Sequence, residues 1–115
     1  FSLMPGSESK LLKGLELGCT GIITATCNVT AQLARRVYDD FFSGKKQMYN
    51  QKLIDVRNAF EKYNLISALH TFKSKEDKIY GNVLPPLGLL DGESENKLME
   101  NLKKLDFQIK SKLAA

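Results

Sequence analysis

The sequence has few of the residues on which metal-binding and membrane proteins depend. It contains one histidine and two cysteines, and Cys19 and Cys27 lie eight positions apart, without the spacing of a zinc site. We therefore expect no metal, and reduced thiols of the kind found in cytoplasmic proteins. No apolar run approaches the roughly 18 residues that a membrane-spanning helix needs, and Phe1 does not open a secretory signal. A cytoplasmic protein without a membrane partner is expected.

Motifs of several common catalytic machineries are also missing. The sequence has no phosphate loop of the Gly-Lys-Ser/Thr kind. Its single histidine, His70, is predicted on a helix far from Ser7 and Ser9, so we expect a structural role and no Ser-His-Asp triad. The net charge of +4 comes from lysines that alternate with acids, as in residues 73–78. This pattern is typical of a solvated helical surface, and no nucleic-acid partner is predicted.

The first 44 residues instead contain two strand–turn–helix units in tandem. Residues 1–4 predict a buried strand, after which Ser7 caps a helix that Gly18 ends. Residues 22–26 predict a second strand. A second helix is predicted to start after Asn28, which serves as its N-cap, and to run toward residue 42, with Gly44 as its stop. Parallel strands joined by helices are covered on both faces, which two strands cannot achieve alone. The pattern therefore predicts the end of a larger α/β protein.

From residue 45 onward the sequence predicts helices only. Apolar stripes mark helices over residues 49–63 and 94–110, a short helix covers residues 65–72, and an ordered loop with two adjacent prolines covers residues 81–92. We therefore divide the chain into residues 1–44 and a helical region, residues 45–115. Each stripe lasts only about two heptads, which favours packing against a host domain over a coiled coil. A small non-catalytic helical module that binds partner helices is the alternative. The predicted stripes are Tyr49, Leu53, Val56, Phe60 and Tyr63, and Leu98, Leu102, Leu105 and Ile109.

Small polar residues gather where the two predicted strands end. In α/β enzymes, ligands bind beyond the carboxyl ends of parallel strands. Here these ends are residues 4–8 and 24–28, where Gly6 lets the backbone approach a ligand closely and free amides begin two helices. The same residue types also make ordinary strand-to-helix turns, so both interpretations stay open. No lysine is predicted at a strand end, so the segment can shape a site but lacks an amine nucleophile.

These two strand ends also carry a family resemblance. Leu3-Met4-Pro5-Gly6-Ser7-Glu8, followed by residues 18–28 (Gly-Cys-Thr-Gly-Ile-Ile-Thr-Ala-Thr-Cys-Asn), resembles the seventh- and eighth-strand region of the dihydrodipicolinate synthase / N-acetylneuraminate lyase family. The helix after residues 43–44 and the loop at residues 84–87 are similar to that family's post-barrel region. The resemblance extends over essentially all 115 residues.

The resemblance implies a fold and a chemistry. The fold class is α/β: the last two βα units of a (β/α)8 TIM barrel, followed by a C-terminal helical region. The activity is that of a class I aldolase or lyase, in which a barrel lysine forms a Schiff base with pyruvate or another 2-oxo acid that reacts with an aldehyde. Pyruvate condensation and cleavage of a 2-keto-3-deoxy sugar acid or of sialic acid are both open. No cofactor is implied, and a homotetramer or homodimer is expected.

The resemblance also implies which functional residues lie in this segment and which lie in earlier strands. The Schiff-base lysine and the catalytic tyrosine of the family belong to earlier strands, so both are expected before Phe1, and this segment is expected to be inactive without the upstream part of the barrel. Gly6 matches the glycine of the loop that lines the substrate pocket, and Glu8 falls near an acidic position that contacts substrate hydroxyls in some members. Ile23 matches a position whose backbone carbonyl faces the Schiff base, and Thr24 replaces a serine or glycine. Leu84 stands in a loop where many members have arginine.

Overall fold

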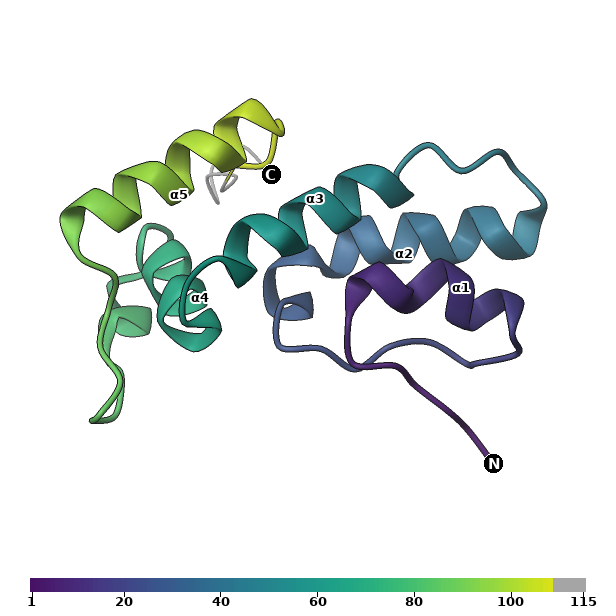
Figure 1. Cartoon of the computed structure of the whole chain (residues 1–115), viewed down its shortest axis with the longest axis horizontal. Helices are drawn as coiled ribbons and strands as arrows, with labels where there is room; N and C mark the ends of the chain where they lie inside the picture. Colours follow the sequence, from purple (N-terminus) through teal and green to yellow (C-terminus); the bar gives the residue numbers. More distant parts are fainter. Residues whose placement is uncertain (109–115) are drawn as a thin grey trace. The chain divides into compact units, whose positions relative to one another are not determined.

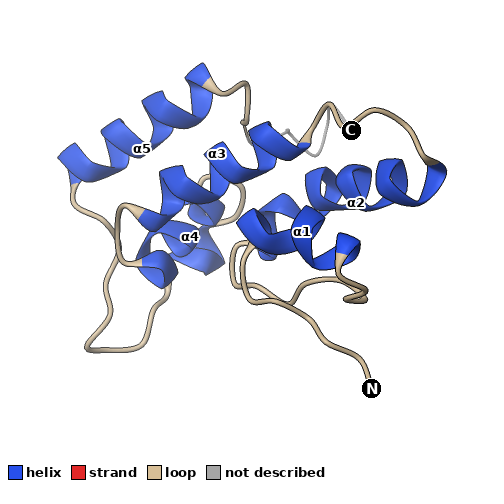
Figure 2. Cartoon of the chain, turned by 45° about the vertical axis from the view of Figure 1, so that its right-hand side comes forward, coloured by secondary structure: helices blue, strands red, loops and turns tan. Residues whose placement is uncertain are grey.

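The computed structural model describes residues 1–108, which form helices joined by loops (Figures 1 and 2). The chain divides into two compact units, Phe1–Asn58 and the part that begins at Ala59. None of the helices among these residues is long and apolar enough to cross a membrane. In chain order the elements are η1 (Glu8–Lys10), α1 (Leu11–Glu16), α2 (Cys27–Ser43), α3 (Asn50–Glu61), α4 (Leu65–Ser74), η2 (Lys78–Gly81) and α5 (Gly92–Lys104).

The two predicted strands are not formed as regular strands within residues 1–108. The segments do lie side by side, because Thr20 N donates to Leu3 O and Ile23 N donates to Pro5 O, each at 3.1 Å. Two hydrogen bonds do not make a ladder, and an isolated pair of strands is marginal without further neighbours. The prediction of two complete βα units is therefore not confirmed in its strands.

An apolar cluster holds the first unit together. Its buried members come from α1, α2 and α3 at three- and four-residue spacings: Leu11, Leu15, Ala34, Val37 and Leu53. The helix ends follow the predicted signals. Ser7 caps η1 by accepting from Ser9 N, Gly18 (φ 91°) follows α1, and Gly44 (φ 68°) ends α2 in the left-handed conformation that glycine adopts without strain. The predicted start of α2, after Asn28, was late by two residues, since the helix begins at Cys27.

Aromatic contacts mark the second unit. The ring of Phe72 lies 5.3 Å from that of Phe60, edge to face, and is stacked with Phe107 at 5.8 Å. The predicted stripe of the last helix is confirmed at Leu98 and Leu102, both buried, but α5 ends at Lys104, earlier than predicted. Ile109, the last member of that predicted stripe, lies outside the described residues.

Two polar contacts fix local geometry in this second unit. Asp91 caps α5 by accepting from Ser94 N at 2.7 Å, and the hydrogen bonds from Ser94 hold the pKa of the Asp91 carboxyl below its ordinary value. His70 Nδ1 lies 2.7 Å from the carbonyl oxygen of Tyr80. Because a carbonyl oxygen only accepts, Nδ1 donates, which fits the structural role expected for this histidine.

Candidate functional site

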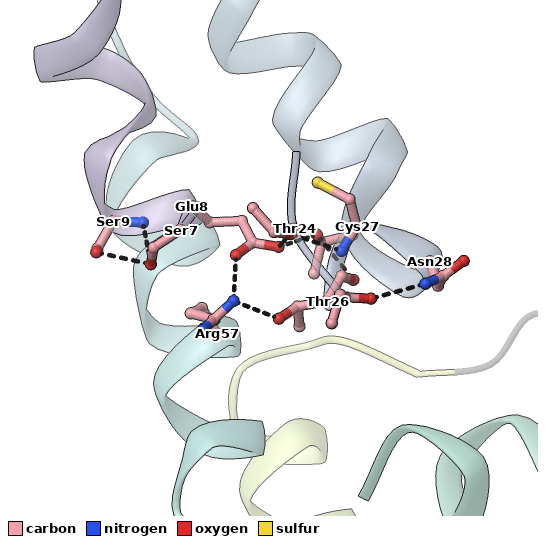
Figure 3. A network of polar contacts seen from close by, with 10 residues as sticks. Ser7, Glu8, Ser9, Thr24, Thr26, Cys27, Asn28 and Arg57 are labelled. Atoms are coloured by element: carbon pink, nitrogen blue, oxygen red, sulfur yellow. Dashed lines mark hydrogen bonds and ion pairs between the residues drawn. The ribbon is translucent and has the colours of Figure 1, made fainter. Parts of the chain in front are cut away.

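The ends of the two paired segments meet at the side chain of Glu8 (Figure 3). Glu8 is the first residue of η1, and its side chain is 0% exposed. Its Oε1 accepts hydrogen bonds from Thr24 Oγ1 at 2.6 Å and from Thr30 Oγ1 at 3.0 Å. A carboxylate is an acceptor with about four lone-pair sites, so hydroxyl donors satisfy it well away from water. Through Glu8, η1 is thus tied to the loop before α2 and to the first turn of α2.

Arg57 brings α3 into the same network. Its Nη1 lies 3.1 Å from Glu8 Oε2 and 2.8 Å from Thr26 Oγ1, and its side chain is 10% exposed. A buried charge is tolerated only when it is paired and hydrogen-bonded, and here each charge compensates the other. The pair joins positions 49 residues apart in the sequence. We call the side chains of Glu8, Thr24, Thr26, Thr30 and Arg57 the Glu8 network.

The segment that leads into α2 is fixed by its own hydrogen bonds. Thr24 Oγ1 accepts from Cys27 N at 3.0 Å, which satisfies one of the free amides at the start of the helix. Thr30 Oγ1 is also within 3.1 Å of Thr26 O, and Asn28 Nδ2 donates to Ala25 O at 2.9 Å. These bonds hold residues 24–28 in a single turn whose hydroxyl groups have defined directions.

The structure brings together some of the predicted site residues and leaves others apart. Glu8 and Thr24 are in direct contact. Gly6 is exposed, and a Cβ built on it would lie 3.9 Å from the carbonyl oxygen of Ile23, so the two predicted backbone contributors are neighbours. The side chain of Ile23 itself is 71% exposed.

Sequence reasoning missed three members of the network: Thr26, Thr30 and Arg57. A signal for Arg57 was present, because it lies four positions after Leu53 and three before Phe60, which places it on the buried face of α3. A charged residue at such a position is rarely buried without a partner. The two threonines carry no comparable signal, since hydroxyl residues near a helix start are common.

The network can orient side chains, but it contains no amine nucleophile and no metal site. Its members are one carboxylate, one guanidinium and three hydroxyls, with no lysine. No group of three or more His, Cys, Asp or Glu side chains within residues 1–108 could hold a metal ion. The arrangement therefore supplies hydrogen bonds and shape.

Comparison with known proteins identifies the family. The model of the dihydrodipicolinate synthetase family matches residues 1–105. The chain belongs to this family. It is 24% identical over 108 residues to uncharacterized DapA-like lyases from two strains of Halobacterium salinarum, covering 91% of this chain and 36% of each relative.

A solved structure shows the same fold. The crystal structure of YagE from E. coli K12, a prophage protein of the dihydrodipicolinic acid synthase family in complex with pyruvate, superposes with a TM-score of 0.72 at 22% identity. The likeness covers 93% of this chain and 38% of YagE, so the chain spans well under half the length of its relatives. The predicted family is confirmed, and the chain folds as part of a barrel-family protein. The helical-module alternative is not favoured.

Proposed function

We propose that the protein to which this segment belongs is a class I aldolase or lyase that forms a Schiff base with pyruvate or another 2-oxo acid. The family match over residues 1–105 carries the proposal. The likeness to a pyruvate-bound relative is consistent with it. Such a reaction needs one amine nucleophile and a proton shuttle, and we assign the lysine and the tyrosine to the upstream part of the barrel.

In this proposal the segment described here forms one wall of the substrate pocket. Gly6 and Ile23 contribute backbone groups, Thr24 contributes a hydroxyl, and Glu8 acts at the same place through Thr24. The network holds the Thr24 hydroxyl in place beside an aldehyde or sugar-acid substrate, but it contains no group that could form an imine. Condensation of pyruvate with an aldehyde and cleavage of a 2-keto-3-deoxy sugar acid both fit this division of roles.

Reductive trapping tests the proposal directly. The protein encoded by the complete reading frame is incubated with pyruvate, reduced with borohydride and digested for mass spectrometry. We expect a stable adduct on one lysine upstream of Phe1. Lactate, which has no carbonyl to form an imine, is the matched control and should leave no adduct. If neither pyruvate nor other 2-oxo acids label a lysine, the Schiff-base mechanism is excluded.

The quaternary structure and location belong to the same proposal. We propose a homotetramer or homodimer in the cytoplasm, as the resemblance implies. Light scattering on the full-length protein tests the oligomer. A monomer at micromolar concentration would contradict it.

A further inference from the structure

We propose that Glu8 and Arg57 are positioning residues, which hold the Thr24 and Thr26 hydroxyls in place while Glu8 itself makes no contact with substrate. This inference rests on the proposed aldolase function. The Glu8 side chain is 0% exposed within this segment alone. Adding further chain to a fixed conformation can only remove accessible surface. Glu8 would therefore be equally hidden in a longer protein, whatever covers the neighbouring loops.

The hydrogen-bond directions give the same answer. Glu8 Oε1 already accepts from two hydroxyls, and Oε2 faces the Arg57 guanidinium at 3.1 Å. A substrate hydroxyl would have to displace one of these partners and leave a buried polar group without its hydrogen bond. The geometry therefore places Glu8 in the protein interior, where a substrate does not reach it.

The network also decides what Thr24 can offer to a ligand. Its single hydroxyl proton points to Glu8, and Cys27 N occupies one of its two lone pairs. What is left is one lone pair, which accepts but cannot donate. Thr24 is half-buried, so this acceptor suits a hydroxyl of the aldehyde portion and disfavours a carboxylate. Without the anionic Glu8, the same hydroxyl would be free to turn.

Arg57 links the network to α3. The Nη1 atom contacts both Glu8 Oε2 and Thr26 Oγ1, and so joins the ends of the two segments from α3. Reactive groups displaced by about 1 Å can lose roughly 100-fold in rate. A change at Arg57 is therefore expected to act on the aldehyde step, while imine formation at the upstream lysine continues.

The experiment compares Arg57→Met with the double variant Glu8→Leu/Arg57→Met in the full-length protein. Arg35→Met is the control, because Arg35 pairs with Asp39 on the exposed face of α2. The aldehyde is the one that wild type condenses with pyruvate fastest. In Arg57→Met we expect kcat/KM for the aldehyde to fall about 10- to 100-fold, with KM for pyruvate and borohydride trapping unchanged.

The double variant separates positioning from folding. Because the double variant removes both members of the Glu8–Arg57 pair, neither is left buried without the other. Its thermal stability should therefore return toward wild type while its aldehyde kcat/KM stays low. Wild-type kcat/KM in a folded Arg57→Met protein, or in the double variant, would overturn the inference. If neither variant folds, Thr26→Val removes only the hydroxyl that Arg57 contacts and must show the same loss. Absence of trapping in wild type would instead contradict the aldolase function itself.

Discussion

Replacing Arg57 by Met should be strongly destabilising, and the structure sets the size of the effect. Met keeps much of the apolar length of the arginine side chain but removes its positive charge. In the wild type that charge lies 3.1 Å from the carboxylate of Glu8, whose side chain is 0% exposed. Breaking a buried pair in this way costs about 3–5 kcal/mol, because the remaining ion is left uncompensated. Thr24 and Thr30 still donate to Glu8, so we expect the lower end, about 3 kcal/mol. That is more than a 100-fold change in the unfolding equilibrium.

Urea unfolding of the full-length protein measures this loss through the transition midpoint. The control is again Arg35→Met, since the Arg35 and Asp39 side chains are 69% and 53% exposed and such pairs contribute about 0.2–1 kcal/mol. The Glu8→Leu/Arg57→Met variant should lie closer to wild type than Arg57→Met does. A loss below about 1 kcal/mol for Arg57→Met, equal to the control, would refute the argument that the pair is buried and mutually dependent.

Three further substitutions test the helix ends and the core. Asp91→Asn keeps an N-cap but loses the stability that the lowered pKa of the Asp91 carboxyl contributes. That contribution is full above the ordinary carboxyl pKa of about 4 and is lost as the pH falls through the lower pKa of the folded carboxyl, so the urea midpoints of variant and wild type should converge there. Gly44→Ala should lose about 1 kcal/mol because φ is +68°, whereas Gly92→Ala, with open space around its Cβ, should be neutral or stabilising in the same assay. Leu98→Ala should lose about 2–5 kcal/mol in thermal or urea unfolding, against less than about 0.5 for the exposed Glu100→Ala on the same helix.

The helices were predictable because their signals are local. Ser7, Gly18 and Gly44 mark helix boundaries through the conformation of one or two residues. The apolar stripes that contain Leu53 in α3 and Leu98 in α5 reflect a 3.6-residue period. These predictions required no knowledge of residues far along the chain. The confirmed part of the fold is therefore the part that the sequence encodes within a few positions.

The strands and the Glu8 network depend on partners far along the chain. A strand is stabilised by its neighbours, and only two backbone hydrogen bonds join residues 3–5 to residues 20–23. The contact between Glu8 and Arg57 joins residues 49 positions apart, and no spacing rule predicts such a pair. Glu8 and Thr24 were named because of the family resemblance, and their direct contact is a finding of the structure.

Burial separates two classes of residue in a segment that spans 36% of its relatives' length. Glu8, Thr30 and Val37 have no exposed surface in this segment. Leu3 and Ile23 are exposed apolar residues on the two paired segments, and burying such side chains is worth about 1.5–3 kcal/mol each. In our proposal the upstream part of the barrel covers these two side chains, whereas the Glu8 network is already formed within this segment. In the same proposal, substrate contact falls to Thr24 and to the exposed backbone beside it, and Glu8 acts only by holding the Thr24 hydroxyl.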